Sequence, residues 1–150
     1  MSFYNGNLYL NTENQTTHVM DIRGNILRTL PTADDITAIT VDRNRIYYTA
    51  IQTFYCCDLY GKVMWALEHE AIKNLSGVTV DADGNVYICD YRTKTILVVS
   101  PDGKHHKEIV SGLDVSPGTI YYDKVTNELI VYFRKKIYFF EIHKQTQYLQ

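Results

Sequence analysis

The chain repeats itself with a period of about 40 residues, and no other feature of the sequence constrains the fold as strongly. Three kinds of landmark share this period: a strand that ends in an apolar residue and aspartate, a tyrosine in the next strand, and a turn glycine. They stand at Val41-Asp42, Val80-Asp81 and Tyr122-Asp123; at Tyr9, Tyr47 and Tyr87; and at Gly24, Gly61 and Gly103. Tandem copies of one supersecondary unit explain all three sets. We therefore divide the single domain into units of about 1–33, 34–73, 74–113 and 114–150.

The pattern within each unit predicts four short antiparallel strands. In residues 74–113 the runs SGVTVD, VYICD, TILVVS and HKEIVS are rich in β-branched and aromatic residues, and ADGN, YRTK and PDGK separate them. Asp-Gly pairs supply the positive φ angles that hairpin turns need. The third run of every unit is nearly continuous in apolar residues, which predicts burial on both faces. Four strands in about 40 residues, repeated in tandem, are typical of β-propeller blades.

The stretch GVTVDADGNVYICDYRTKTILVVSPDGKHHKEI, residues 77–109, resembles an NHL repeat. NHL repeats form the propeller blades at the C-terminus of many tripartite-motif proteins. The resemblance implies an all-β propeller of four-stranded antiparallel blades, about four per chain. After Asp90 the sequence departs from the family pattern, and the other units match more loosely. The matching positions are Val80-Asp81, Gly84-Asn85, Tyr87, Asp90 and Asp102-Gly103.

The acidic segment that begins at Asp81 has the composition of a calcium loop but not its spacing. An EF-hand loop needs glycine at position 6 and a carboxylate at position 12. Counted from Asp81, these positions hold Val86 and Arg92. We expect Asp81 and Asp83 to cap a hairpin by accepting backbone N–H bonds, with Gly84 in the left-handed conformation.

Composition sets limits on the class of protein. With 45% hydrophobic residues and a formal net charge of −2, the chain is neither a disordered tail nor a strongly basic nucleic-acid protein. Its apolar runs are too short to span a bilayer, and its N-terminus has no basic segment followed by an apolar one, so we expect no membrane association and a cytoplasmic location. The three cysteines, Cys56, Cys57 and Cys89, are expected to be buried reduced thiols.

Motifs for catalysis are missing from the sequence. No His, Cys or carboxylate set has metal-ligand spacing, and there is no Gly-x-Ser-x-Gly motif or phosphate-binding glycine loop. We expect no enzyme activity, no catalytic residues, no metal and no cofactor. One enzymatic alternative stays open, because lactonase-like propellers are metal-dependent hydrolases with carboxylates around the central channel. Its candidate carboxylates are Asp34, Asp35, Glu68, Glu70 and Asp114.

Binding is the expected function, because loops at the two ends of a propeller vary without disturbing the blades. The loops between second and third strands are basic in the last two units only, and Tyr91 beside Arg92 offers a stacking surface. In NHL-type domains this face binds protein or RNA. The negative net charge places protein first and RNA second. The candidate binding residues are Tyr91, Arg92, Lys94, Arg134, Lys135 and Lys136.

The first and last units are expected to be incomplete. If Gly6-Asn7 corresponds to Gly84-Asn85, blade one lacks its innermost strand, while TQYLQ at the C-terminus is a candidate final strand. Closed propellers of this family need about six blades, so the chain corresponds to part of a ring. It is either a portion of a longer protein or one of several copies that associate. We expect a homodimer that closes the propeller, since exposed edges and apolar blade faces disfavour a lone arc.

Overall fold

The computed structural model describes residues 1–142, and within them the chain is built from β-strands joined by short turns. The strands form separate antiparallel sheets in which neighbours follow the order of the chain. None of the described residues lies in a helix long and apolar enough to cross a membrane. The strands are β1 (Ser2–Tyr4), β2 (Asn7–Asn11), β3 (Thr16–Asp21), β4 (Ile26–Pro31), β5 (Ala38–Asp42), β6 (Arg45–Thr49), β7 (Thr53–Asp58), β8 (Val63–Glu68), β9 (Leu75–Val80), β10 (Val86–Asp90), β11 (Thr95–Val99), β12 (His106–Val110), β13 (Thr119–Asp123), β14 (Glu128–Phe133) and β15 (Lys136–Glu141).

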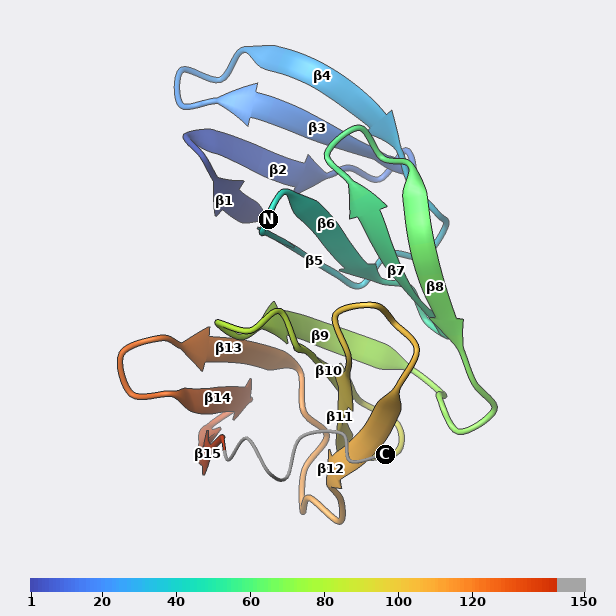
Figure 1. The fold of residues 1–150 in the computed structure, drawn as a ribbon, viewed down its shortest axis with the longest axis vertical. Helices are drawn as coiled ribbons and strands as arrows, with labels where there is room; N and C mark the ends of the chain where they lie inside the picture. The colour runs from blue at the N-terminus through green and yellow to red at the C-terminus, as the bar shows by residue number, and fades with distance from the viewer. Residues whose placement is uncertain (143–150) are drawn as a thin grey trace.

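The sheets are arranged as successive blades around a hollow (Figure 1). Blade 1 contains β1–β4, blade 2 contains β5–β8, blade 3 contains β9–β12, and blade 4 contains β13–β15. The first strand of each blade lies innermost and the last lies at the rim. The prediction of an all-β propeller with about four four-stranded blades is confirmed. The expected unit boundaries lie in the connections 32–37, 69–74 and 111–118.

The expectation that blade 1 lacks its innermost strand is wrong. Ser2–Tyr4 forms this strand and pairs with β2, with Ser2 opposite Tyr9 and Tyr4 opposite Asn7. The two-residue turn at Asn5 and Gly6, with φ values of 48° and 78°, is tighter than the turn in blade 3, so the strand fits into the first residues of the chain. The candidate final strand TQYLQ, residues 146–150, lies outside the described residues.

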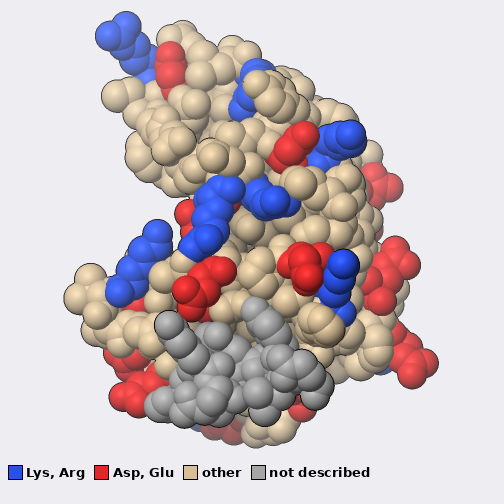
Figure 2. Space-filling model, viewed as in Figure 1, with Lys and Arg blue, Asp and Glu red and all other residues tan. Residues whose placement is uncertain are grey.

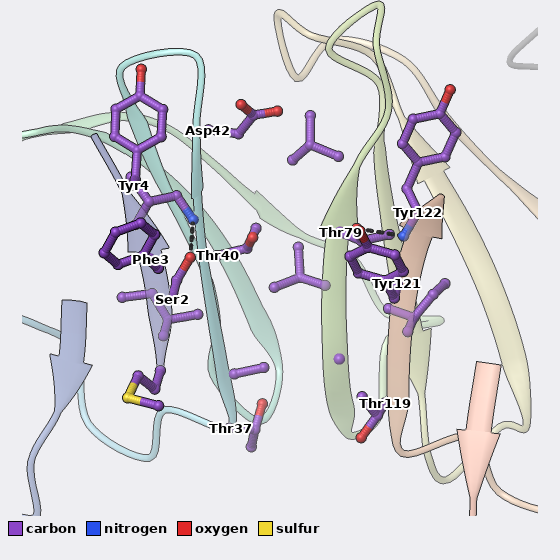
Figure 3. Close-up of a pocket in the computed structure, with 18 of the residues that line it drawn as sticks. Ser2, Phe3, Tyr4, Thr37, Thr40, Asp42, Thr79, Thr119, Tyr121 and Tyr122 are labelled. Carbon is purple, nitrogen blue, oxygen red and sulfur yellow. Dashed lines mark hydrogen bonds between the residues drawn. The ribbon is translucent and has the colours of Figure 1, made fainter. Parts of the chain in front are cut away.

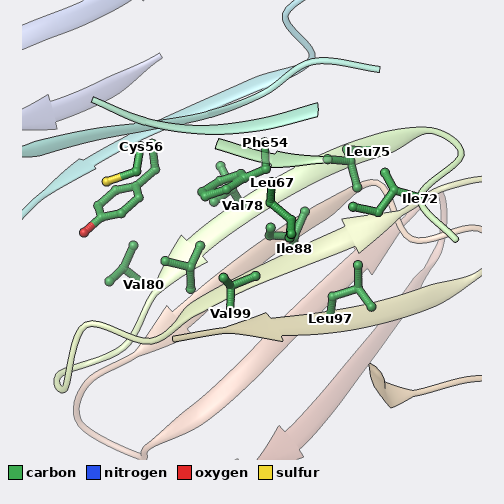
Figure 4. Close-up of a cluster of buried hydrophobic side chains, with 12 residues drawn as sticks. Phe54, Cys56, Leu67, Ile72, Leu75, Val78, Val80, Ile88, Leu97 and Val99 are labelled. Atoms are coloured by element: carbon green, nitrogen blue, oxygen red, sulfur yellow. The ribbon is translucent and has the colours of Figure 1, made fainter. Parts of the chain in front are cut away.

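Apolar packing between successive blades forms the core. We call the face that a blade turns toward the preceding blade its trailing face, and the opposite face its leading face. The leading face of each blade packs on the trailing face of the next. The junction of blades 1 and 2 buries Tyr9, Val19, Leu30, Ile39, Val41, Ile46, Tyr48 and Cys57. The junction of blades 2 and 3 includes Phe54, Leu67, Val78, Val86 and Ile88 (Figure 4), and that of blades 3 and 4 includes Tyr87, Ile96, Val98, Ile120 and Leu129.

Burial of the third strands on both faces is confirmed in full for β11 alone, where every residue is buried. In β3 buried residues alternate with half-buried ones, because among residues 1–142 no blade covers the trailing face of blade 1. In β7 Thr53 and Tyr55 are half-buried, while Phe54, Cys56 and Cys57 are buried. Strand β15 is largely exposed, because no further blade covers the leading face of blade 4. The prediction of burial on both faces is therefore wrong for β3 and β15. It is largely correct for β7, where Phe54 and Cys56 are buried against blade 3 and Cys57 is buried on the opposite face against blade 1.

The acidic turn of blade 3 forms as predicted around Asp81. The Asp81 Oδ1 atom accepts the backbone N–H groups of Asp83 and Asn85 at 2.8 and 3.0 Å, and Gly84 has a φ of 87°. Asp83 differs from the expectation, because it contributes its amide N–H to this turn as a donor. In other blades Asp21 and Asp58 accept two backbone N–H bonds each in the same manner. The recurring aspartates are therefore turn caps.

The three cysteines are free and buried, as the sequence analysis predicts. Burial raises the pKa of Cys57 to about 11 and that of Cys89 to about 12. Burial also raises the pKa of Cys56, although the hydrogen bond from Arg45 opposes this shift. The thiols accordingly stay protonated at neutral pH, as expected of core residues.

Gly103 lies in the turn between β11 and β12, under the indole of Trp65 from blade 2. A Cβ atom at this position would lie 2.4 Å from Trp65 Cδ2, and the φ of 75° is itself unfavourable for alanine. Gly24 is the matched control, because it has a φ of 88° in the equivalent turn and no atom within 4 Å of its Cβ position. We expect Gly103→Ala to lower the free energy of unfolding by about 2 kcal/mol more than Gly24→Ala does, as measured by urea denaturation.

The cause of this difference is tested in the Trp65→Ala background. Without the indole, Gly103→Ala should cost no more than Gly24→Ala. An equal cost for the two glycine variants in the presence of Trp65 would show that the indole does not restrict this turn.

Candidate functional site

The candidate binding residues lie at one end of the blades, which we call the loop face. It consists of the connections between second and third strands, at 12–15, 50–52, 91–94 and 134–135, and of the connections between blades. Antiparallel strands in chain order bring both kinds of connection to the same end. Tyr91, Arg92, Lys94, Arg134 and Lys135 lie in two neighbouring loops, and Lys136 begins β15. All six side chains are exposed.

Aromatic contacts join the loops of blades 3 and 4. The rings of Tyr91 and Phe133 meet edge to face with centroids 5.5 Å apart. The Arg134 guanidinium carbon lies 5.1 Å from the centre of the Phe133 ring. Phe133 therefore lies between an aromatic and a cationic candidate. Sequence analysis did not select Phe133, although its position directly before the basic run RKK was the available signal.

Asp90 fixes the conformation of the loop that carries Tyr91. Its side chain is buried and accepts backbone N–H bonds from Arg92 and Thr93 at 3.0 and 3.1 Å. It also accepts the N–H groups of Lys73 and Asn74, at 2.8 and 3.2 Å, from the connection between blades 2 and 3. One carboxylate thus anchors two segments of the loop face, because a buried carboxylate needs several donors.

Asp114 binds two side chains of β15 in blade 4. Its carboxylate accepts hydrogen bonds from Lys136 Nζ and from the Tyr138 hydroxyl group. These bonds, the one from Lys136 first, hold the pKa of Asp114 below its usual value, and they raise the pKa values of Lys136 and Tyr138. The positive charge of Lys136 is therefore compensated by the Asp114 carboxylate, while Arg134 and Lys135 beside it are exposed cations.

Acidic residues lie on the loop face near blades 1 and 2. Asp34 and Asp35 line a hollow of about 590 Å³ with residues 50–53 and Tyr55. Glu68 ends β8 and Glu70 follows it, while Asp114 belongs to the group with Lys136. Among residues 1–142, no three His, Cys, Asp or Glu side chains are grouped so that they could hold a metal ion. Of the carboxylates named for the hydrolase alternative, Glu68 ends a strand and the other four lie in the connections between blades.

Positive and negative side chains are interspersed on the visible side of the molecule, and its outline is hollowed between the two pairs of blades (Figure 2). The inner strands β1, β5, β9 and β13 line this central hollow, which has a volume of about 870 Å³ (Figure 3). Phe3 and Tyr121 are on opposite walls, with Asp42 and several hydroxyl groups between them.

Hydroxyl groups connect the inner strands of neighbouring blades at equivalent positions. Ser2 Oγ accepts the N–H of Val41 at 3.0 Å, and Thr79 Oγ1 accepts the N–H of Tyr122 at 3.0 Å (Figure 3). These bonds satisfy backbone donors on strand edges that would otherwise face the hollow. The first joins blades 1 and 2, and the second joins blades 3 and 4.

Comparisons with known proteins establish the fold. No protein-family model and no curated protein matches the chain. Among solved structures, the computationally designed Ika4 protein matches with a TM-score of 0.70 and 15% identity, over 95% of this chain and 89% of its own. The β-propeller domain of Myceliophteria thermophila Cps50 (Swd1) matches with a TM-score of 0.73 and 12% identity, over 92% of this chain and 50% of its own. Virginiamycin B lyase from Staphylococcus aureus matches with a TM-score of 0.68 and 13% identity, over 97% of this chain and 55% of its own.

These similarities show a β-propeller fold. The chain spans about half the length of the Cps50 and lyase chains. The NHL resemblance of residues 77–109 is an interpretation of the sequence that these matches do not test.

The contact between Asp114 and Lys136 is expected to depend on pH. Because hydrogen bonds lower the folded-state pKa, the stabilising contact is present above the ordinary aspartate pKa and is lost as pH falls through the lowered value. In the Lys136→Met variant we expect the Asp114 pKa to rise toward its ordinary value, as followed by NMR of the carboxyl carbon. Lys135→Met is the matched control and should leave this pKa unchanged. Equal titration of Asp114 in the Lys136→Met variant and the unaltered chain would contradict the contact.

Proposed function

We propose that the chain is a non-catalytic protein-binding module that uses the loop face of blades 3 and 4. The observation that carries this proposal is the contact of the exposed Tyr91 ring and Arg134 guanidinium, from two adjacent loops, with the half-buried ring of Phe133 at the end of β14. Tyrosine and arginine are the residue types most enriched at the energetic centres of protein interfaces. The anchoring of the Tyr91 loop by Asp90 supports the same proposal, because a preformed loop loses little conformational freedom on binding.

The mixed charge of the loop face favours a protein over a nucleic acid. Arg92, Lys94 and Lys135 are basic, but Asp34 and Asp35 lie on the same end of neighbouring blades. Nucleic-acid binding relies on a continuous run of cations that neutralise successive phosphates. A protein partner with an acidic and apolar surface fits the basic half without meeting this requirement.

RNA is the second candidate, and one observation favours it. Tyr91 is an exposed aromatic ring flanked by Arg92 and Lys94, which is the combination that single-stranded RNA uses for stacking and phosphate contact. The NHL resemblance is part of this proposal, since NHL-type propellers bind either partner on this face. Recognition of a protein substrate, as in tripartite-motif proteins, is the finer form of our first candidate.

The experiment is affinity capture from an extract of the cells that produce the protein, with and without ribonuclease. Tyr91→Ala combined with Arg134→Glu removes the aromatic and cationic contacts of the loop face. Tyr60→Ala combined with Arg28→Glu is the matched control, because the Arg28 guanidinium carbon lies 5.0 Å from the centre of the exposed Tyr60 ring at the opposite end of the blades. Thermal stability of both double variants equal to that of the unaltered chain would show that both are folded.

We expect a protein partner that is retained after ribonuclease and binds the Tyr91–Arg134 variant at least about tenfold more weakly. The control should bind like the unaltered chain. Loss of capture after ribonuclease, together with direct binding of a single-stranded oligonucleotide, would replace the protein proposal with RNA. If every captured partner bound the two variants equally well, the loop face would not be the binding surface.

A further inference from the structure

The leading face of blade 4 is apolar, and among residues 1–142 no further strand covers it. Tyr121, Tyr132, Ile137 and Phe139 lie on this face and are between 48% and 62% exposed. The strand pairings make Tyr132, Ile137 and Phe139 equivalent to Cys89, Ile96 and Val98 of blade 3. Those three residues are fully buried, because blade 4 covers them. Equivalent positions are therefore buried in blade 3, which has a following blade, and exposed in blade 4.

The trailing face of blade 1 shows the complementary situation. Phe3 is 61% exposed, Leu10 is 38% exposed, and Leu8 and Met20 are half-buried. The pairings make these residues equivalent to a buried set in blade 3 that packs against blade 2. That set is Val80, Ile88, Val86 and Val99. The two ends of the arc thus carry the two halves of one more blade junction.

We propose that a second copy of this chain covers both faces and closes the ring. The leading face of blade 4 in each copy packs on the trailing face of blade 1 in the other. The occupant is inferred from continuity, because three junctions within the chain already join a leading face to a trailing face. Exposed apolar faces of this kind mark interaction surfaces in soluble proteins.

The number of copies follows from the blade count. The arc formed by residues 1–142 does not close on itself, since the faces that would meet are exposed at both of its ends. Two copies give a ring of about eight blades, which is within the usual range of about four to eight for propellers. Three copies would give about twelve. A junction between two different faces gives a closed ring when the rotations from one copy to the next add up to a full turn. In the proposed ring each of the two copies covers half of this turn.

The central hollow is incomplete without the second copy. Phe3 and Tyr121 belong to the inner strands at the two open ends, and both line the hollow (Figure 3). At the new junctions Tyr121 takes the position that Ser2 and Thr79 hold inside the chain, according to the strand pairings. A tyrosine hydroxyl lies too far from its own backbone to repeat their bonds to the next inner strand. The packing of rings would therefore hold the intermolecular junctions together.

The test is the solution mass of the chain by light scattering over a dilution series. We expect a mass near twice 17.4 kDa. Phe139→Lys alters the leading face and Phe3→Lys alters the trailing face, so each variant damages both junctions of the ring. Both should yield monomers of 17.4 kDa with unchanged circular dichroism, since the substituted side chains are exposed in one copy. Val125→Lys is the control, because Val125 is 93% exposed in the turn between β13 and β14, away from these faces.

Each other outcome overturns the proposal. A monomer of the unaltered chain at tens of micromolar would mean that the faces stay uncovered. A dimer that survives Phe3→Lys but not Phe139→Lys would mean that leading faces pack on each other. A larger assembly would exclude the two-copy ring. If a lysine variant lost its circular dichroism signal, the serine variants Phe139→Ser and Phe3→Ser would be measured in place of the lysine variants. If both serine variants remained dimers, this result would count against the proposal.

Discussion

The packing of one apolar sheet face on another is the interaction on which this structure depends. A single four-stranded sheet of these short strands has two apolar faces and cannot bury either alone. Each junction joins aromatic and aliphatic side chains of a leading face to those of a trailing face, as Tyr87 and Val98 meet Leu129 between blades 3 and 4. Within residues 1–142 the extensive contacts between blades are those of neighbours, so the stability of this part of the chain is close to a sum of blade and junction terms. The loops, the central hollow and the ends of the arc all derive from this stacking.

Much of the fold could be predicted from the sequence, because each repeat contains the same turn caps and the same buried positions. The recurring aspartates cap turns by accepting backbone N–H bonds, and the recurring tyrosines Tyr9, Tyr47 and Tyr87 lie at equivalent buried positions. Strand β1 was missed because alignment on Gly84-Asn85 assumed the longer turn of blade 3. The exposure of β15 was missed because an apolar run predicts that a face is suitable for burial, without indicating whether a neighbour is present.

The candidate site was less predictable than the fold. The exposed cations could be placed on loops from their positions in the repeat, and the structure places Tyr91 and Arg134 in neighbouring loops. The contact through Phe133 depends on how two blades are oriented, which no spacing within one unit encodes. The same is true of Asp114 and Lys136, since Asp114 lies in the connection between blades 3 and 4 and Lys136 begins β15. The loop face is acidic near blades 1 and 2 and basic near blades 3 and 4, so its charge changes from negative to positive along the arc of blades.

Blade 3 is the one blade whose described strands β9, β10 and β11 are almost wholly buried. The amide groups of these three strands should therefore exchange with solvent only through large openings of the molecule, while in a single copy those of blades 1 and 4 should exchange through local fraying. The loop that carries Tyr91 extends from this most deeply buried sheet and is held by Asp90. A ligand of that loop would meet an ordered backbone, so a smaller share of its binding energy would be lost to conformational entropy than on the outer blades.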